Sequence, residues 1–474
     1  MQFSNRRRRA RATLALLLGL TAAAPAGADA ARYTTVAAPR AVSAAPRAAP
    51  APQAPPLPAP TPEAIAAAAR LRIDLITMGP GDAVWERFGH NALRVYDPAT
   101  GMDVTYNWGM FDFAAEDFYP RFLRGDMLYW MAPFDTRAVV YAYMASNRSV
   151  YAQELNLTAE QKARLVAFLE WNDRDENRYY AYHYYRDNCS TRVRDAIDYA
   201  LGGQLREALS DVATDATYRS HTRRLTADDL PIYTGLTLAM GPSIDRPLSA
   251  WEESFLPLEL RRHVRGVRVR GGGGEGSEGR EEGEAMPLVA SETVLFEADR
   301  AEPPAMPPDR IPGYLAAGAL LGTLFLALGR FAARGARTGR VGLVALGGVW
   351  AFVVGTLGTV IALLWAFTRH DVTYANENLL QVNPIPLALV VLLPMAVVKG
   401  RAWRAAEAVA WVVAGASAAG LLLQALPGLD QVNGEIIALA LPAHLGLAGA
   451  LRIARRRTAA PEDAAAPRAA PARV

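Results

Sequence analysis

The sequence contains very little cysteine and lysine. Its 474 residues include one cysteine, Cys189, and only two lysines, Lys162 and Lys399. One cysteine cannot form an internal disulfide, so Cys189 is either a small buried apolar residue or a free thiol kept for its reactivity. Because Cys189 lies far from the N-terminus, we do not expect the mature chain to be anchored through a lipidated cysteine.

The sequence also lacks the patterns that indicate a metal, a nucleotide or a nucleic acid. Its six histidines are dispersed, so we expect no metal and no other cofactor. No segment resembles a glycine-rich phosphate-binding loop. The formal net charge of +3 becomes −1 once residues 1–30, with five arginines and one aspartate, are removed. A chain with so little net charge gives no reason to expect nucleic acid as a partner.

The N-terminus has the three parts of a secretory signal. Arginines at positions 6–9 and 11 precede an uncharged stretch over residues 12–24, and small residues follow up to Ala30. Thirteen uncharged residues are too few to span a bilayer comfortably, so residues 1–30 are predicted to be a cleaved signal peptide. Residues 31–65 are rich in Ala and Pro, which predicts an extended tether.

Long apolar runs in the C-terminal part predict a transmembrane domain over residues 311–454, followed by a cytoplasmic tail over 455–474. About five helices are expected, since each run approaches the length needed to cross a bilayer. Arginine and lysine gather after the first, third and fifth runs, and cytoplasmic loops show this enrichment. Loops 369–381 and 430–435 are therefore expected outside, in a multi-pass protein of the bacterial cytoplasmic (inner) membrane. The apolar runs cover residues 311–329, 341–368, 378–398, 408–429 and 436–451.

Between tether and membrane lies a predicted α+β domain over residues 66–263, followed by a Gly/Glu/Pro-rich linker over 264–310. Alternating apolar residues predict three strands that form a β-meander, with a turn at residues 97–101. Thr158 and Gln161 have the capping-box spacing of a helix start, and a second helix should begin at Asp187 or Asn188. The strands are expected at residues 71–77, 91–96 and 103–108, and the helices at 158–172 and from 187 or 188 to 200.

Cys189 falls in the first turn of the second predicted helix, directly after the polar pair Asp187 and Asn188. A helix N-terminus lowers the pKa of a thiol and presents backbone N–H groups to an oxyanion. Cys189 is therefore a candidate catalytic nucleophile. A buried structural cysteine stays open as the alternative interpretation.

The candidate base for this thiol is His90, at the start of the second predicted strand. A strand imidazole facing a thiol at a helix start is the thiolate–imidazolium arrangement of papain-like catalysis. Asn107, on the neighbouring predicted strand, is the best-placed side chain to orient the ring, although it could also be a turn-facing amide. His183, six residues before Cys189, is the rival base.

The histidine precedes the cysteine by about a hundred residues, an order that matches circularly permuted relatives of papain. The motifs that surround both residues resemble the periplasmic domain of the Lnb-type bacterial lipoprotein N-acyltransferases, over about residues 70–262. The likeness extends to His370 and to residues 376–384, which look like that family's outward loop. The motifs lie at residues 79–82, 87–90, 106–113, 148–150, 155–158, 187–192 and 253–257.

The resemblance implies a papain-like, circularly permuted domain and a thiol-dependent acyltransferase. Cys189 would take a fatty acyl chain from a membrane phospholipid and give it to the N-terminal amine of a lipoprotein. His370, Asn376 and Asn378, with Asn383, are expected to bind substrate at a lipid-facing entrance, or else to cap helix ends in a polar connector. A papain-like cell-wall peptidase or amidase uses the same Cys–His pair and stays an alternative. A non-catalytic envelope module that binds lipid or protein is a second alternative.

Overall fold

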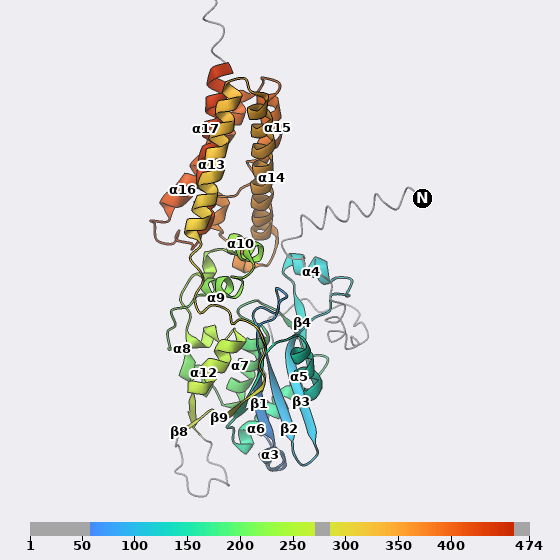
Figure 1. Ribbon diagram of the computed structural model, residues 1–474. Coiled ribbons are helices and arrows are strands. Elements are labelled where there is room, and N and C mark those ends of the chain that lie inside the picture. The colour runs from blue at the N-terminus through green and yellow to red at the C-terminus, as the bar shows by residue number, and fades with distance from the viewer. Residues whose placement is uncertain (1–56, 271–284, 459–474) are drawn as a thin grey trace, which may run out of the picture. The chain divides into compact units, whose positions relative to one another are not determined.

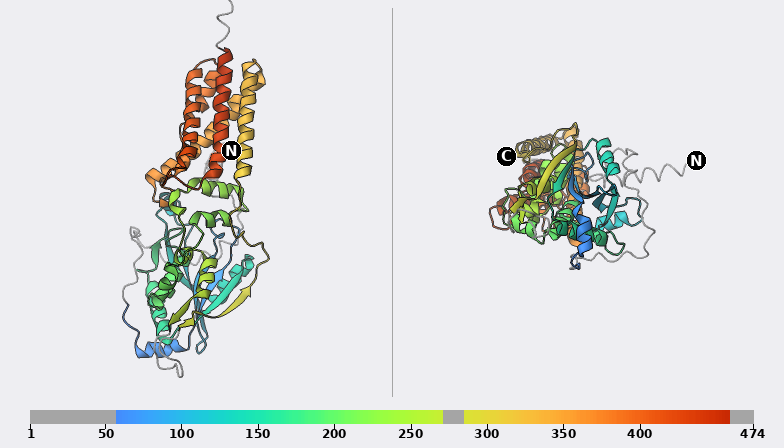
Figure 2. Two further views of the ribbon diagram at one scale, coloured as in Figure 1. Left: turned by 90° about the vertical axis from the view of Figure 1, so that its left-hand side faces the viewer. Right: turned by 90° about the horizontal axis from the view of Figure 1, so that it is seen from below.

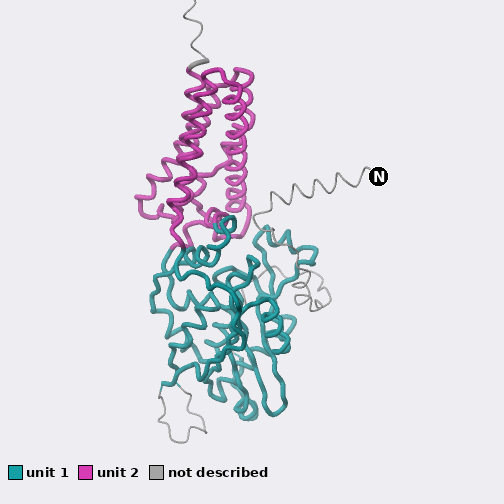
Figure 3. The backbone as a smooth tube through the Cα atoms, in the orientation of Figure 1, with its two compact units in different colours: residues 1–233, 246–307 teal, residues 234–245, 308–474 magenta. Residues whose placement is uncertain are grey.

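The computed structural model describes residues 57–270 and 285–458. The predicted signal peptide, most of the tether, the centre of the predicted linker and most of the C-terminal tail lie outside these residues. The chain divides into two compact units, which Figure 3 colours separately. Unit 1 runs to Tyr233 and includes Arg246–Pro307, whereas unit 2 consists of Thr234–Asp245 and the chain from Pro308 onward.

Unit 1 is built on a seven-stranded antiparallel sheet with the order β6-β4-β3-β2-β1-β5-β9. The predicted meander is confirmed, because three consecutive strands pair with their neighbours as expected. A mixed α+β domain with a large antiparallel sheet is therefore present. The strands are β1 Arg72–Met78, β2 His90–Asp97, β3 Met102–Met110, β4 Leu128–Asp135, β5 Val150–Leu155, β6 Tyr179–Ala181 and β9 Val289–Phe296; β7 Arg268–Arg270 and β8 Ala285–Pro287 form a separate pair.

Both faces of the sheet are covered by helices, because successive side chains of a strand point to opposite faces. On β1, Ile73 and Leu75 join the larger core with helices α6, α7 and α12, whereas Ile76 and Met78 pack on the other face against residues of α5. Figure 1 shows α7 and α5 on different sides of the strands. The helices of unit 1 are α3 Pro62–Ala69, α4 Phe118–Arg124, α5 Thr136–Ala145, α6 Ala159–Asn172, α7 Cys189–Ala200, α8 Gln204–Ser210, α9 Tyr218–Leu225, α11 Ala250–Glu253 and α12 Pro257–Gly266.

The two predicted helices begin where the capping residues placed them. Thr158 caps α6, and its hydroxyl accepts a hydrogen bond from the backbone N–H of Gln161, whose side-chain oxygen accepts one from the backbone N–H of Thr158. Asn188 caps α7, so Cys189 is the first residue of that helix. The capping chemistry thus sets the position of Cys189 to within one residue.

Part of the segment that was expected to be a linker, residues 264–310, is instead folded. Residues 268–270 and 285–287 form β7 and β8, and β9 pairs with β5 along the edge of the main sheet. Strand β9 contains valine, threonine and phenylalanine, which favour strands, although the surrounding Gly, Glu and Pro dominate the local composition. The end of the predicted tether is folded too, because residues 62–65 begin α3.

Unit 2 is a helical bundle whose helices run alongside one another, as Figures 1 and 2 show. Four of its helices are long and apolar enough to cross a membrane. The expected third span is shorter than predicted: α15 has 11 residues, with Pro386 at its N-cap and Pro394 inside it. Proline lacks the N–H that an inner helical turn requires, which limits this helix. The bundle contains α13 Ile311–Ala333, α14 Arg337–Phe367, α15 Leu387–Val397, α16 Trp403–Leu423 and α17 Gly434–Thr458.

Helices α13 and α17 pack closely because small residues face each other. A Cβ atom added to Gly446 would lie 2.3 Å from the Cα of Gly322, and one added to Gly322 would lie 2.4 Å from the carbonyl oxygen of Pro442. Small residues that allow backbones to approach are typical of helix contacts in membranes. The packing of unit 2 therefore agrees with the length and hydropathy of its helices.

Candidate active site

The start of α7 fixes the position of the candidate nucleophile. The side chain of Asn188 accepts hydrogen bonds of 2.9 Å from the backbone N–H groups of Ser190 and Thr191. In return, the backbone N–H of Asn188 donates to the hydroxyl of Thr191 at 2.7 Å. This capping box leaves Cys189 at the first helical position, with intermediate exposure to solvent.

The surroundings of Cys189 keep its thiol protonated at neutral pH. Burial raises the pKa of Cys189 to about 11, and this effect exceeds the opposite influence of nearby backbone N–H groups of Asn91, Ser190 and Cys189 itself. The helix start does favour the thiolate, but desolvation of the charged form is the larger effect.

His90 and Asn107 lie together on neighbouring antiparallel strands. The Nε2 atom of His90 is 3.2 Å from Oδ1 of Asn107, and both side chains are buried. The Nδ2 group of Asn107 donates to the carbonyl oxygen of Thr105 at 2.9 Å, which turns Oδ1 toward the ring. An amide oxygen can only accept, so Nε2 carries the proton and Nδ1 is the basic nitrogen of the neutral ring.

The same site holds His90 in its neutral form. Burial is the main cause that lowers the pKa of His90 to about 4, and the positive charge of Arg148 lowers it further, against the hydrogen bond to Asn107. At neutral pH the imidazole can therefore accept a proton. At neutral pH the thiol of Cys189 and the imidazole of His90 are therefore both uncharged.

The residues that follow His90 and Cys189 join the two elements that carry them. The Nδ2 group of Asn91 donates to the hydroxyl of Ser190 at 2.9 Å, and both side chains are fully buried. The backbone of Asn91 also acts on the thiol of Cys189. Strand β2 and helix α7 are thus fixed to each other one residue beyond the candidate base and nucleophile.

His183, the alternative candidate base, makes its hydrogen bonds within the turn that it begins. Its Nδ1 accepts hydrogen bonds of 3.1 Å from the backbone N–H groups of Tyr185 and Arg186, and its Nε2 lies 2.9 Å from the guanidinium of Arg186. His183 and Asp187 also form an isolated β-bridge. Both ring nitrogens of His183 therefore have partners within the hairpin that precedes α7.

Two family models match the chain. The Lnb N-terminal periplasmic domain matches residues 60–224, and the Lnb transmembrane domain matches residues 320–428. The chain belongs to the Lnb family. No curated protein and no solved structure matches it. With its periplasmic domain and four apolar helices of sufficient length, this Lnb-family protein is a multi-pass membrane protein.

Sequence reasoning assigned no role in the site to several other residues of the Lnb periplasmic domain. The ring of Tyr143 stacks on His90 with centroids 6.1 Å apart, and the guanidinium of Arg148 lies 4.6 Å from the centre of that tyrosine ring. Tyr180 and Tyr182 also interact electrostatically with Cys189. Their spacing of two residues just before the cysteine was the available signal, since it places both on one face of a strand.

The geometry of the site also depends on the segment from Glu253 to Pro257. Carbonyl oxygens of this segment accept hydrogen bonds from three polar side chains around the thiol. The hydroxyl of Ser190 donates to Ser254 at 2.8 Å, and Nδ2 of Asn188 donates to Phe255 at 3.1 Å. This backbone therefore holds the first turn of α7 in place.

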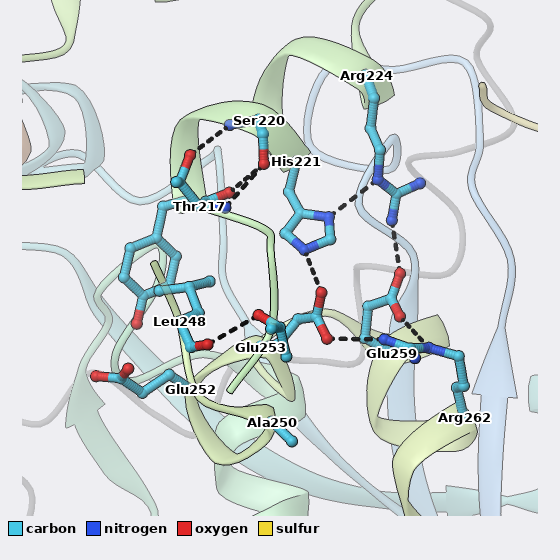
Figure 4. Close-up of polar contacts among 12 residues, drawn as sticks. Thr217, Ser220, His221, Arg224, Leu248, Ala250, Glu252, Glu253, Glu259 and Arg262 are labelled. Carbon is cyan, nitrogen blue, oxygen red and sulfur yellow. Dashed lines mark hydrogen bonds and ion pairs between the residues drawn. The ribbon is translucent and has the colours of Figure 1, made fainter. Parts of the chain in front are cut away.

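Glu253 also belongs to a buried ion-pair network, which Figure 4 shows. Within the described ranges, His221, Glu253 and Glu259 form the one grouping whose ligand atoms lie close enough for a metal ion. However, Arg224 donates to Glu259 at 2.7 Å and Arg262 donates to both carboxylates, at 2.6 and 2.8 Å. These guanidinium groups already neutralise and hydrogen-bond the acids, so the network fits a structural role. The absence of a metal from the mechanism stays a prediction.

The amides of the loop around residues 376–383 contact the C-terminal end of α10 (Leu230–Ala239), whose last residues belong to unit 2. Asn376 donates to the carbonyl oxygens of Leu238 and Ala239 at 2.9 Å, and Asn378 donates to that of Leu238 at 3.0 Å. Carbonyl groups at a helix end lack partners within the helix, so these side chains cap it.

His370 lies at the N-cap of a 3₁₀ turn, and the Oδ1 of Asn383 accepts from the backbone N–H of Ile385 at 3.2 Å. Like Asn376 and Asn378, these two residues are buried in unit 2. A substrate-binding role for His370, Asn376 and Asn378 stays a prediction.

Proposed function

We propose that this Lnb-family protein is an acyltransferase of the bacterial inner membrane. It moves a fatty acyl chain from a phospholipid, through a thioester on Cys189, to the N-terminal amine of a lipoprotein. The observation that supports this most is a neutral thiol at a helix start together with a neutral imidazole held by Asn107. The phospholipid donor and the lipoprotein acceptor both reside in the membrane, which fits a chain whose helices are long and apolar enough to span it.

The first half-reaction forms the thioester. As Sγ of Cys189 attacks the acyl carbonyl carbon, Nδ1 of His90 accepts the thiol proton, and the carbonyl π electrons move onto oxygen. The oxyanion then collapses and breaks the bond to the glycerol oxygen. His90 returns its proton to that oxygen, so a lysophospholipid leaves and the acyl chain stays on sulfur.

The second half-reaction regenerates the thiol. The amine of the lipoprotein attacks the thioester carbonyl, a carbon–nitrogen bond forms and the carbon–sulfur bond breaks. The proton lost by the amine passes through His90 to the departing sulfur. Asn107 keeps the ring oriented during both steps, because its Oδ1 accepts from Nε2 of His90.

A papain-like fold with permuted order is part of this proposal. A nucleophile helix that packs against an antiparallel sheet, and a histidine and an asparagine on adjacent strands, support it. In the chain the histidine strand precedes the cysteine helix. The order of the elements is thus that expected of a permuted relative.

The activity is testable with the full-length protein in vesicles whose phospholipid carries a labelled acyl chain. We expect a hydroxylamine-labile label on Cys189, and its transfer to a peptide with a diacylglyceryl cysteine at its N-terminus. Cys189→Ser should carry no such label. Release of cell-wall fragments without acyl labelling would indicate the peptidase or amidase instead, and silence in both assays would indicate a binding module.

The orientation in the inner membrane has a separate test. Asp430 and Arg337, the first residue of α14, are both exposed and are expected on opposite sides of the membrane. In a Cys189→Ala background, Asp430→Cys should react with a membrane-impermeant thiol reagent in intact spheroplasts, and Arg337→Cys should react only after lysis. The reverse pattern would refute the proposed topology.

A further inference from the structure

Beside the candidate nucleophile lies a buried hydroxyl that the Cys189, His90 and Asn107 arrangement does not use. Tyr180 is on β6 and its side chain is 3% exposed. Among the described residues, its hydroxyl has no hydrogen-bond partner. An unsatisfied buried hydroxyl destabilises a fold. One reason for retaining such a group is that its partner arrives with a ligand or forms during a reaction.

The hydroxyl of Tyr180 and the side chain of Cys189 border the same small space. Gly109 lies between them, at a point where the pairing of β3 and β4 shifts register. A Cβ atom added to Gly109 would lie 3.5 Å from the Cβ of Cys189 and 3.9 Å from the hydroxyl oxygen of Tyr180. Because glycine has no side chain, no atom of residue 109 fills the position between the Cys189 side chain and the Tyr180 hydroxyl.

The ring of Tyr180 is held in a fixed orientation. The guanidinium carbon of Arg192 lies 4.2 Å from the ring centre. Asp187 in turn accepts a hydrogen bond of 2.9 Å from Arg192. The hydroxyl is therefore preorganised, which is the property that makes a hydrogen-bond donor effective toward developing charge.

Tyr180 is neutral, so its hydroxyl can act as a hydrogen-bond donor but not as a base. Burial raises the pKa of Tyr180 well above its usual range, despite the positive charge of Arg192. The phenol therefore stays protonated at neutral pH. It can donate a hydrogen bond but cannot compete with His90 for the thiol proton.

We propose that Tyr180 is a catalytic residue whose hydroxyl donates a hydrogen bond to the oxyanion formed when Cys189 attacks an acyl carbonyl. The inference rests on the proposed function, because it requires an acyl substrate. When the carbon–sulfur bond forms, the π electron pair moves to the carbonyl oxygen, and Tyr180 stabilises that negative charge without giving up its proton. Collapse of the intermediate restores the carbonyl and releases the hydrogen bond.

Two reactions of the same thiol separate this role from a structural one. Alkylation of Cys189 by iodoacetamide forms no oxyanion, whereas acylation by a p-nitrophenyl ester does. In Tyr180→Phe, measured on the full-length protein in vesicles, we expect acylation to fall by about 100-fold, the usual effect of losing one oxyanion donor. The rate and pH profile of alkylation should stay those of the wild type. The melting temperature should be equal or higher, because an unsatisfied polar group is removed.

Tyr179→Phe is the matched control, since it removes the same atom from the preceding residue of β6, which points to the other face. It should keep both rates. Full acylation by Tyr180→Phe would overturn the proposal. An equal loss of alkylation and acylation would also overturn it, because the hydroxyl would then act on the thiol and not on the oxyanion. The proposed function fails separately if wild-type Cys189 is acylated by the ester but never by phospholipid.

Discussion

The pH dependence of Cys189 alkylation distinguishes a neutral thiol from a resting ion pair. Burial raises the pKa of Cys189 to about 11, from an ordinary value of 9.0. At pH 7 only about one thiol in ten thousand is then ionised, and this fraction grows tenfold with each pH unit. Iodoacetamide reacts with the thiolate. The alkylation rate should therefore rise about tenfold per unit from pH 6 to pH 10.

The chain suits this experiment because Cys189 is its only cysteine. The full-length protein would be incubated with iodoacetamide at a series of pH values, and the modified fraction read by intact-protein mass spectrometry. The same chain unfolded in denaturant gives the reference, since its thiol returns to an ordinary pKa. At neutral pH its thiolate fraction should be about 100-fold larger than that of the folded protein. Cys189→Ser should incorporate no label.

A rate that stays level between pH 5 and pH 8 would refute this reasoning. Such a plateau is the behaviour of a preformed thiolate–imidazolium pair, as in papain-like enzymes with a strongly lowered thiol pKa. It would mean that the helix terminus and the imidazole outweigh burial in the free protein. His90 would then be charged at rest rather than neutral.

Further expectations concern the other residues of the site. Cys189→Ser should abolish acyl transfer without changing expression or membrane insertion, because a serine hydroxyl is scarcely ionised at neutral pH; near-normal activity of the purified variant would exclude the thiol as nucleophile. His90→Ala should be as damaging as loss of the thiol and Asn107→Ala milder, whereas His183→Ala, which alters only a turn, should keep activity; loss in His183→Ala alone would identify a different base. Because the pKa of His90 is lowered to about 4 in the folded protein, protonating this ring opposes folding. The free energy of unfolding should therefore be highest above pH 6.5 and fall by about 3 kcal/mol as the pH drops toward 4. Melting temperatures measured across this pH range should fall with pH in the wild type, and fall less in His90→Gln. Gly109→Ala should lower acylation more than alkylation, because the added Cβ enters the space beside Cys189 and the backbone φ of +91° disfavours a side chain.

Local patterns predicted the elements that carry the site. Alternation of apolar residues located β1, β2 and β3, and the polar pair before Cys189 located the start of α7. These signals act over a few residues and need no knowledge of the rest of the chain. Strand β9 was missed because its pairing with β5 joins residues more than a hundred positions apart, and its flanking composition resembles a linker.

The electrostatics of the site could not be predicted from the same patterns. A helix start suggested a lowered thiol pKa, but the sign of the shift depends on how deeply the whole fold buries Cys189. Likewise, Arg148 belongs to one of the motifs of the resemblance, but its effect on the site follows from the end of α5 and its turn into β5, which place it beside Tyr143. Desolvation is a property of the packed structure and not of a motif.

The positive charge of Arg148 affects the protonation of both Cys189 and His90. Its guanidinium lowers the pKa of both Cys189 and His90, so it favours an anion on sulfur and disfavours a proton on the ring. A resting thiolate–imidazolium pair would need both charges at once, and Arg148 opposes the second of them. A proton taken by His90 should therefore pass quickly to the leaving oxygen or sulfur. The negative charge that the site stabilises best is then the transient one on the carbonyl oxygen during attack by Cys189. Tyr180 can donate a hydrogen bond to this oxygen, and the positive charge of Arg148 lies nearby.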